Sequence, residues 1–278
     1  MRTLKLTIAY DGTTFLGWQR QARGPSIQGL LEGAVARLEG GPVTAVGAGR
    51  TDAGVHALGQ VASVRVSFGH GVETVGRALN ACLPAEVRVL RVEEAPDGFH
   101  ARYSARAKVY RYVIATGETM SPFLARYAWH VRHALDVGAM REAARAIEGS
   151  HDFVAFQSAG SAAATTLRTV FESAIREEVT TFPCGWPDDR DTGRSEPPSG
   201  ALAPGASRHG TAAGLTYEVR GDGFLRHMVR AIVGTLVEIG SGRRAAREMA
   251  ELVERGSRAA AGPTAPARGL FLVRVDYD

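Results

Sequence analysis

The chain has 278 residues and is 45% hydrophobic, so it can bury a large core either in one α/β domain or in two halves around a cleft. Its formal net charge of +4 is compatible with an anionic partner, but charge alone does not establish one. The two cysteines, Cys82 and Cys184, have no zinc-ligand or disulfide-framework spacing, and no apolar run is long enough for a membrane span, so we expect a cytoplasmic protein with no membrane partner.

The first half of the chain predicts the element order β-α-β-β-α-β. Apolar residues alternate from Leu4 to Tyr10, which is typical of a strand with one buried face. Ser26 is the predicted N-cap of a helix whose apolar stripe ends at Leu38. Further elements are expected as strands over 43–46, 61–66 and 87–92 and as a helix over 72–83. This order predicts an antiparallel sheet with helices on one face, which is an α+β fold.

The second half repeats this mixture of elements. Its patterns predict strands over 109–115, 170–179, 215–220 and 270–275, and helices over 136–149 and 224–239. We therefore expect two α+β domains, residues 1–107 and 108–278, with the active site in the cleft between them. Residues 182–213 are rich in Pro, Gly, Ser and Asp and hold few large apolar groups, so they predict an exposed, mobile insertion.

A loop with three glycines is the most unusual local sequence in the first half. It places Arg50 and Asp52 between Gly47, Gly49 and Gly54. Glycine is required where φ is positive or where another segment or a ligand comes close. An aspartate in such a loop is usually a turn former. A phosphate-binding interpretation is weak, because the third glycine of a dinucleotide motif is missing and a strand, not a helix, follows.

Residues 99–112 combine aromatic and basic side chains. Strand alternation puts Tyr110, Tyr112 and Ile114 on one face, close to several cations. Such a surface suits a nucleic acid, because aromatic rings stack on bases while Arg and Lys hold phosphates. Packing of the tyrosines at the edge of the core explains the same pattern, and both interpretations stay open.

A third cluster, residues 221–230, opens the helix of the second half. Arg226 and Arg230 are four residues apart and share one side of that helix. A solvated basic face is the usual explanation of such a pair. Arg230, however, lies next to the apolar stripe, and an arginine in that position usually has a carboxylate partner.

The three clusters, in this order, resemble those of the TruA-type pseudouridine synthases. Further matches run along nearly the whole chain and leave mainly the insertion unmatched: Tyr10-Asp11-Gly12, residues 17–21, 49–56, 59–61, 99–102, 110–112, 149–153 and 224–230, Gly234, and residues 261–270. The resemblance implies a pseudouridine-synthase fold. It also implies an isomerase that converts uridines 38, 39 and 40 of the tRNA anticodon stem-loop to pseudouridine, works as a homodimer and needs no metal or organic cofactor.

The resemblance also implies roles for single residues. Asp52 matches the family's catalytic aspartate, Arg230 the arginine that pairs with it, and Tyr110 the tyrosine that stacks on the base. Arg50 matches an arginine that helps to displace the base, and Leu270 a leucine that lines the base pocket. We expect Arg230 to grip the carboxylate with two nitrogens, as a guanidinium can.

The chemistry of the reaction is consistent with these assignments. An isomerisation needs no external group donor, and one ionised carboxylate suffices. The sequence leaves open whether Asp52 adds to C1′, adds to C6 or removes the ribose 2′ proton. A stacked uridine must first be extruded, and stacking on Tyr110 would offset that cost. The basic residues expected to contact the RNA backbone are Arg102, Arg106, Lys108, Arg168 and Arg226.

The residues also allow two rival functions. A metal site is conceivable from Asp52 with His56 or from His130 with His133, but neither pair has the signature of a zinc hydrolase, so we expect structural or RNA-facing histidines. The other rival is an RNA-binding or chaperone module of the same fold without turnover. Retention of Asp52, Tyr110 and Arg230 together argues against it, because binding alone does not require that trio.

Overall fold

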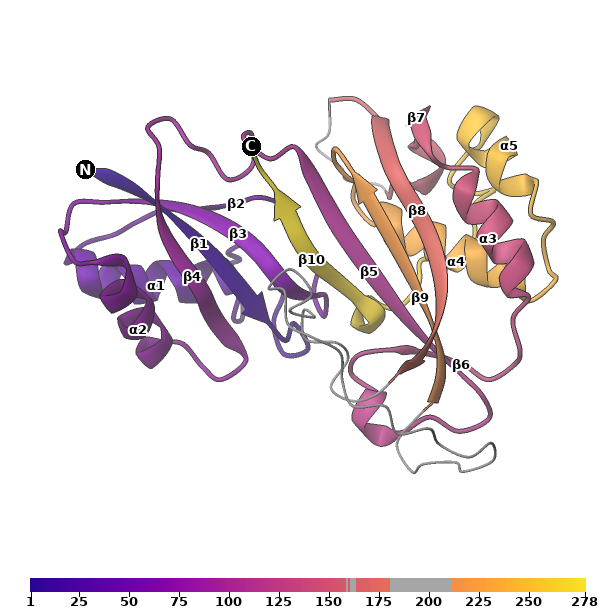
Figure 1. The fold of residues 1–278 in the computed structure, drawn as a ribbon, viewed down its shortest axis with the longest axis horizontal. Helices are drawn as coiled ribbons and strands as arrows, with labels where there is room; N and C mark the ends of the chain where they lie inside the picture. Colours follow the sequence, from indigo (N-terminus) through magenta and orange to yellow (C-terminus); the bar gives the residue numbers. More distant parts are fainter. Residues whose placement is uncertain (159, 161–163, 181–211) are drawn as a thin grey trace, which may run out of the picture.

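The sheet of this protein runs through both halves of the chain. In the computed structural model, which describes residues 1–158, 160, 164–180 and 212–278, ten strands form one sheet in the order β4-β1-β3-β10-β5-β9-β8-β7, with β2 paired to β3 and β6 to β5 (Figure 1). Most strand pairs are antiparallel, and the predicted α+β class is confirmed. The predicted insertion at 182–213 lies, except for its last two residues, outside the described residues.

The first half follows the predicted order of elements. Ser26 caps the first helix as predicted, because its Oγ accepts a hydrogen bond from Gly29 N at 3.3 Å. Strand β3 begins at His56, earlier than predicted, because His56 pairs with Phe271 and Ala57 pairs with Tyr10. The elements are β1 (Arg2–Tyr10), α1 (Ile27–Glu39), β2 (Ala45–Gly47), β3 (His56–Val66), α2 (Val72–Cys82) and β4 (Val87–Ala95).

The second half differs from prediction at its helix ends. Helix α3 begins after the predicted N-cap Asp136 but stops at Arg145, and Gly149, with φ at +104°, already belongs to β7. Helix α4 begins at Met228 because His227 has a left-handed backbone. The elements are β5 (Ala107–Thr116), η1 (Pro122–Leu124), β6 (Trp129–Val131), α3 (Val137–Arg145), β7 (Gly149–Asp152), η2 (Val154–Phe156), β8 (Leu167–Thr180), β9 (Ala212–Gly221), α4 (Met228–Gly240), α5 (Glu248–Arg255), η3 (Ala267–Gly269) and β10 (Leu270–Asp276).

The C-terminal strand connects the two halves. Strand β10 lies between β3 and β5 (Figure 1). It is parallel to β3, where Phe271 and Leu272 pair with His56 and Ala57, and antiparallel to β5, where Leu270 pairs with Tyr112. A strand at the end of the chain therefore completes the sheet in its middle.

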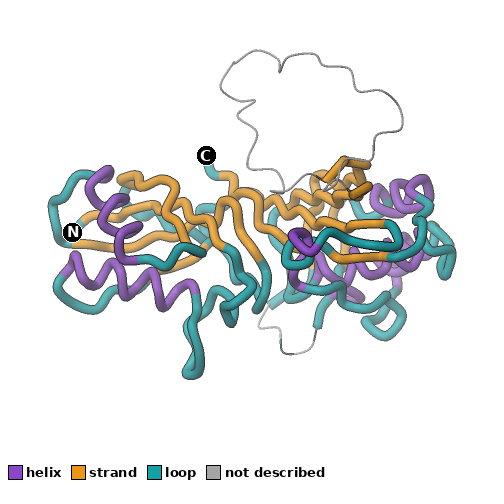
Figure 2. Tube along the Cα trace, turned by 90° about the horizontal axis from the view of Figure 1, so that it is seen from below, coloured by secondary structure: helices purple, strands orange, loops and turns teal. Residues whose placement is uncertain are grey.

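The helices gather into two groups that cover the sheet near its ends. Helices α1 and α2 lie against the N-terminal strands, and α3, α4 and α5 lie against β5, β9 and β8 (Figures 1 and 2). One apolar cluster includes residues from both groups and from the strand faces beneath them, whereas Val113 and Phe271 belong to a small cluster on the other face. None of the described helices is both long enough and apolar enough to cross a membrane.

His56 ties the first half to the second. Its ring is buried and stacks on Phe271 at 4.7 Å, and its Nε2 lies 3.0 Å from the carbonyl oxygen of Arg126 and 3.1 Å from that of Arg268. Its Nδ1 lies 3.1 Å from Asp11 Oδ1. Both ring nitrogens are thus engaged within the fold, which makes His56 a structural residue.

Asp11 is held in its ionised form by several donors. Burial alone would raise the pKa of its carboxyl group, but hydrogen bonds from His56, Thr13 and Tyr127 together hold that pKa well below its usual value. The Tyr127 hydroxyl donates to Oδ2 at 2.9 Å and the Thr13 amide donates to Oδ1 at 2.9 Å. The carboxylate therefore stabilises the fold only while it is charged.

Replacement of Asp11 by Asn should lower the melting temperature by about 2 to 6 °C at pH 7. The pKa of Asp11 is lower in the folded state than in the unfolded state. Its carboxylate therefore contributes its full stabilisation above the unfolded-state pKa, about 3.9, and this stabilisation is lost as the pH falls through the folded-state pKa. The difference between wild type and variant should therefore shrink below about pH 4. Calorimetry at pH 7 and pH 3 tests this, with the exposed Asp97→Asn as control, and an equal difference at both pH values would contradict it.

Candidate active site

The loop that carries Asp52 is fixed on both sides by hydrogen bonds. Before it, Gln60 Nε2 donates to the carbonyl oxygen of Gly49 at 2.9 Å. Next to it, the Trp18 amide donates to the carbonyl oxygen of Thr51 at 3.0 Å, and the Tyr10 hydroxyl lies 2.8 Å from Thr51 Oγ1. These bonds set the direction in which the Asp52 side chain leaves the loop.

Close approaches explain most of the glycines around this loop. Gly54 has φ at +76°, and a Cβ at Gly47 would lie 2.5 Å from the Trp18 ring, so both meet the expectation from the sequence. Gly49 does not, because a Cβ there would meet Lys108 at an ordinary 3.6 Å. Gly17, from a different segment, is constrained in both ways: its φ is +93°, and a Cβ would lie 2.5 Å from the carbonyl oxygen of Thr51.

The structure brings Asp52 together with two side chains of the second half. Arg230 Nη1 lies 3.6 Å from Asp52 Oδ2, and His227 Nε2 lies 3.3 Å from the same oxygen. The Asp52 side chain is 34% exposed, whereas that of Arg230 is 15% exposed. A carboxylate that a ligand can reach is thus backed by a guanidinium that is largely covered.

The sequence led us to expect that Arg230 holds the carboxylate with two nitrogens, but the structure shows no such hold. Its Nε donates to the carbonyl oxygen of Ala265 at 2.7 Å, and the Ala265 amide in turn donates to the carbonyl oxygen of Arg230 at 3.0 Å. One edge of the guanidinium is therefore occupied by the backbone. The nitrogen nearest to Asp52, Nη1, lies 3.6 Å from Oδ2, which is within ion-pair distance but beyond hydrogen-bond distance.

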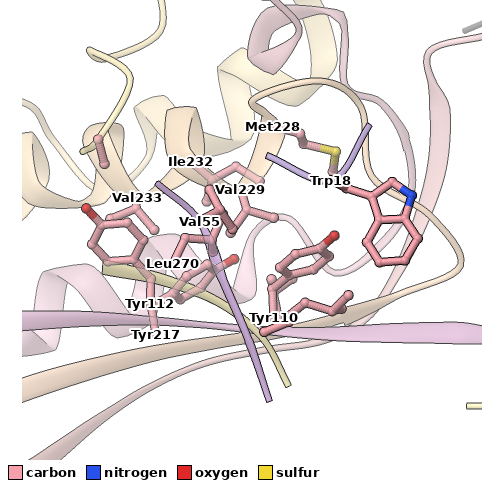
Figure 3. Packing of buried hydrophobic residues seen from close by; sticks show 14 of the residues in the cluster. Trp18, Val55, Tyr110, Tyr112, Tyr217, Met228, Val229, Ile232, Val233 and Leu270 are labelled. Carbon is pink, nitrogen blue, oxygen red and sulfur yellow. The ribbon is translucent and has the colours of Figure 1, made fainter. Parts of the chain in front are cut away.

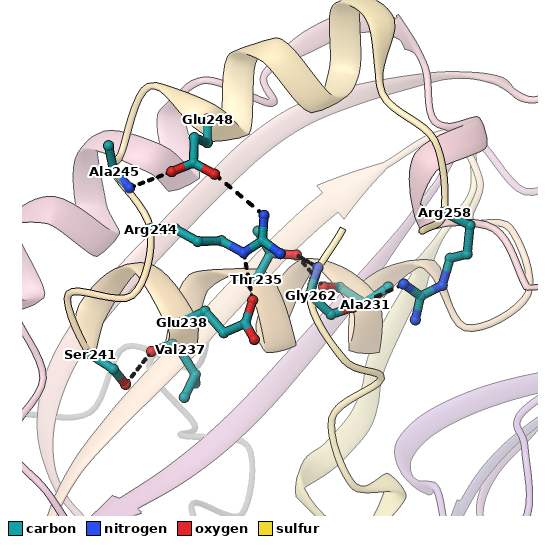
Figure 4. Close-up of polar contacts among 10 residues, drawn as sticks. All are labelled: Ala231, Thr235, Val237, Glu238, Ser241, Arg244, Ala245, Glu248, Arg258 and Gly262. Carbon is teal, nitrogen blue, oxygen red and sulfur yellow. Dashed lines mark hydrogen bonds and ion pairs between the residues drawn. The ribbon is translucent and has the colours of Figure 1, made fainter. Parts of the chain in front are cut away.

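The backbone that receives Arg230 is fixed against α4. Thr235 Oγ1 accepts from the Gly262 amide at 2.9 Å and donates to the carbonyl oxygen of Ala231 at 2.9 Å, and Arg258 Nη1 donates to the carbonyl oxygen of Gly262 at 2.9 Å (Figure 4). A Cβ at Gly234 would lie 1.7 Å from the carbonyl oxygen of Pro263, so only glycine permits this approach. The partner of Arg230 is thus part of a rigid layer.

Tyr110 and Leu270 lie in the apolar cluster near this ion pair (Figure 3). Tyr110 is only 7% exposed and meets the ring of Phe224 edge-on at 5.1 Å. Burial, followed by its neighbours Tyr10 and Asp52, raises the pKa of the Tyr110 phenol, so it stays protonated. Leu270 is 6% exposed.

Tyr112 is a core residue and forms no exposed platform with Tyr110. Its side chain is fully buried, and its hydroxyl donates to the carbonyl oxygen of Pro266 at 2.7 Å. Of the two interpretations of the strand pattern, packing in the core holds for Tyr112. The predicted alternation is nevertheless confirmed, because Tyr110, Tyr112 and Ile114 all face the main cluster.

Some of the basic residues expected to contact RNA lie beside the Asp52 loop. Burial and the charges of Arg102 and Arg168 lower the pKa of Lys108 against the opposing effect of Asp222, so the charge of Lys108 is felt together with those of the two arginines. The Lys108 side chain also borders Gly49. Lys108, Arg102 and Arg168 therefore make a positive patch, which we call the basic patch.

The remaining predicted cations differ in their environment. Arg226 and Arg50 are exposed, and for Arg50 no hydrogen bond or ion pair is present among the described residues. Arg106 is engaged with the C-terminal residue, because its Nε donates to Asp278 Oδ2 at 2.9 Å. An RNA phosphate at Arg106 would have to displace this carboxylate.

The sequence did not assign a role to His227. His227 precedes Arg230 by three residues, a spacing that places both side chains on one side at the start of α4. This spacing could have been recognised in the sequence. The histidines of the rival metal hypothesis lie elsewhere: His130 Nε2 is 2.7 Å from the carbonyl oxygen of Gly117, and His133 Nε2 is 2.7 Å from Ser241 Oγ. The described residues contain no group of three His, Cys, Asp or Glu side chains arranged around a metal ion.

Comparisons with known proteins agree on one family. A family model described as tRNA pseudouridine synthase matches residues 6–104 and 143–278. Proteins named tRNA pseudouridine synthase A are similar over the full chain: those of Syntrophotalea carbinolica and Geobacter sulfurreducens are each 42% identical over 277 residues, and that of Moorella thermoacetica is 43% identical over 280 residues. The alignments cover 100% of this chain and 97%, 100% and 100% of those proteins, respectively.

Replacement of Gly17 by Ala should displace the Asp52 loop, because a side chain at positive φ would also overlap the backbone of Thr51 and Asp52. We expect a melting temperature lower by about 5 °C or more and faster amide hydrogen exchange at residues 51–53. Gly33→Ala is the matched control, because a Cβ there meets nothing within 4 Å and lies in helix α1. Equal behaviour of the two variants would refute this role of Gly17.

Proposed function

We propose that this chain, which belongs to the tRNA pseudouridine synthase family, isomerises uridines 38, 39 and 40 of the tRNA anticodon stem-loop with Asp52 as nucleophile or base. Enzymes of this family are isomerases that act on uridine in tRNA. The observation that carries the proposed mechanism is the partly exposed Asp52 carboxylate backed by Arg230 at 3.6 Å.

The reaction conserves every atom of the nucleotide except one exchangeable proton. The bond between N1 and C1′ breaks, a bond between C5 and C1′ forms, the hydrogen on C5 leaves as a proton, and N1 takes up a proton. A carboxylate can promote this by adding to C1′, by adding to C6 or by removing the 2′ proton, and all three routes begin from its ionised form. Arg230 supplies a positive charge beside Asp52 that favours this form.

The uridine must leave the base stack before the carboxylate can reach it. Arg50 is exposed two residues before Asp52, so its guanidinium is free to occupy the space that the base vacates. Tyr110 and Leu270 are proposed to receive the uracil. Because both side chains are almost fully covered and Phe224 packs against the ring of Tyr110, the base gains a stacking face only if a neighbour such as Phe224 moves.

The basic patch supports an interaction with the RNA backbone. Lys108 borders the Asp52 loop at Gly49 and interacts electrostatically with Arg102 and Arg168, and Arg226 is exposed just before α4. Their charges would hold phosphates around a uridine that enters the site, and such contacts read shape more than sequence. This suits an enzyme that accepts several adjacent positions in many tRNAs.

Domain limits, assembly and location are extensions of the family resemblance. We propose an N-terminal domain of residues 1–107, a C-terminal domain of residues 108–278 and a homodimer of such subunits. A cytoplasmic location is proposed because the tRNA substrate is found there. The alternative function, RNA binding without turnover, does not account for a covered arginine directed at a partly exposed carboxylate.

Replacement of Asp52 by Ala should abolish pseudouridine formation while tRNA binding survives, because the variant removes the reacting group and leaves the basic patch intact. Release of tritium from tRNA labelled at uridine C5 measures the reaction, since the C5 hydrogen is lost only when the new bond is complete. Asp97→Ala, a change at an exposed carboxylate, is the control. Normal tritium release by the Asp52 variant would disprove the assignment.

Replacement of Arg230 by Lys should lower kcat by about 30-fold or more. One ammonium group cannot both donate to Ala265 and stand beside Asp52, as the guanidinium does. Single-turnover tritium release on saturating tRNA measures the effect. Arg255→Lys, in the exposed part of α5, should behave as wild type, and near-normal turnover of the Arg230 variant would count against the ion pair.

A further inference from the structure

Tyr103, in the loop between β4 and β5, is the most exposed aromatic residue in the part of the chain that the structure describes. It is 76% exposed, whereas Tyr110 beside the candidate site is almost fully covered. A single exposed ring is common on protein surfaces and needs no function. Tyr103 differs from such a ring in its rigid support, its stacking partner and its charged neighbours.

The loop that carries Tyr103 is fixed against the sheet through Ala101. The Ala101 amide donates to Ser63 Oγ in β3 at 3.2 Å, and its carbonyl oxygen accepts from the Tyr277 hydroxyl, just after β10, at 2.7 Å. Ala101 is fully buried and belongs to a small apolar cluster with Ala48, which directly precedes Gly49 of the Asp52 loop. An aromatic side chain on so firmly held a loop loses little conformational entropy when a ligand binds to it.

The ring of His100 supports the ring of Tyr103. Their centroids are 4.3 Å apart and their planes are inclined by 26°. The imidazole is itself fixed, because its Nδ1 accepts hydrogen bonds from the amides of Arg102 and Tyr103, each at 3.2 Å. The Ser104 amide closes the same turn by donating to the carbonyl oxygen of His100 at 2.9 Å. Tyr103 therefore rests on a fixed ring, and its large exposure leaves room for a second planar group to stack on it.

Positive charge accompanies this pair of rings. The guanidinium carbon of Arg102 lies 5.7 Å from the centroid of Tyr103. Burial, followed by the charge of Arg102, lowers the pKa of Lys108, and the Lys108 side chain borders Gly49. The rings thus adjoin the basic patch through Arg102, and the basic patch adjoins the Asp52 loop through Lys108.

An open aromatic ring beside cations matches an unpaired nucleotide. Every base has a face that stacks on an aromatic side chain, and an adjacent arginine suits the phosphate. An apolar protein partner would instead require a larger apolar patch. The base that stacks on Tyr103 is not the uridine that reacts, because a ring so open to solvent cannot enclose a reacting base, and Tyr110 is proposed to receive the target.

We propose that Tyr103, supported by His100, binds a second base of the tRNA, an unpaired base of the anticodon loop, whose phosphate Arg102 holds. This inference rests on the proposed function for its RNA partner. A second anchored base would keep the stem-loop on the basic patch while the target uridine turns into the site. The contact therefore contributes to binding and leaves the chemical step unchanged.

The first test separates the aromatic face from apolar bulk. Tyr103→Leu keeps the bulk and removes the face, whereas Tyr103→Phe keeps the face. We expect Tyr103→Leu to raise Kd for a fluorescently labelled anticodon stem-loop RNA by about 5- to 100-fold, and Tyr103→Phe to bind within about twofold of wild type. The rate of single-turnover tritium release from saturating tRNA should be unchanged in both variants.

The second test identifies the partner base and the phosphate contact. Stem-loops in which one loop base at a time is replaced by an abasic nucleotide are compared on wild type and Tyr103→Leu. At one position the abasic RNA should lose affinity for wild type and lose little for the variant, because both changes remove the same contact. Arg102→Gln should reduce the slope of log Kd against log salt concentration by about 1, whereas Tyr103→Leu should leave the slope unchanged.

The matched control is Phe171→Leu. Phe171 is 47% exposed and lies 5.1 Å from the guanidinium carbon of Arg220, but Arg220 also donates to Asp276 Oδ2 at 3.0 Å. An exposed ring whose arginine is already paired with a carboxylate should not attract RNA, so Kd should stay at the wild-type value. Melting temperatures of the Tyr103 and Phe171 variants should lie within about 2 °C of wild type, because both positions are exposed.

The outcomes separate this inference from the proposed function. A wild type that binds the stem-loop but releases no tritium would overturn the proposed function, and the Kd values would still decide on Tyr103. A wild type that does not bind the stem-loop would overturn both. Binding by Tyr103→Leu within about twofold of wild type would overturn the inference alone. Equal losses in the Leu and Phe variants of Tyr103, an equal loss in Phe171→Leu, or additive losses at every abasic position would also overturn it.

Discussion

The guanidinium of Arg230 is the point on which the candidate site depends. One edge donates to the carbonyl oxygen of Ala265, and the other faces Asp52 at 3.6 Å. A guanidinium is planar and rigid, so fixing one edge also fixes the other. The guanidinium therefore holds a positive charge from the second half of the chain at a fixed place beside a carboxylate of the first half.

The sheet explains why these distant segments meet. Strands β3 and β10 are parallel neighbours, and His56 near the start of one pairs with Phe271 near the start of the other. The segments that lead into two parallel strands must approach each other at the same end of the pair. The Asp52 loop precedes β3 and the segment around Ala265 precedes β10, so the short parallel pairing brings both segments within reach of α4. His56, which contacts the carbonyl oxygen of Arg268, strengthens this junction.

Local patterns predicted most elements but not the way in which the halves join. The alternation from Leu4 to Tyr10 and the N-cap Ser26 depend on neighbours in the sequence, and both predictions were confirmed. Strands β6 and β7 have three and four residues, too few for a period to emerge. Gly17 and His227 were missed as parts of the site, because their importance lies in contacts with Thr51 and Asp52 from remote segments. The 3.6 Å separation between Arg230 and Asp52 was equally hidden, since no pattern reveals that Ala265 occupies the Nε of Arg230.

The unequal exposure of Asp52 and Arg230 follows from what each must do. An ion pair that is partly exposed contributes little to stability, so the pair is better understood through the site than through the fold. Full burial of the carboxylate would impose a large desolvation cost and block the substrate. Full exposure of the arginine would let solvent compete for its donors and leave its orientation free. A backbone carbonyl replaces water on the covered side of the guanidinium, and the carboxylate side chain stays 34% exposed. The arrangement therefore combines a fixed positive charge with a reactive group that remains accessible.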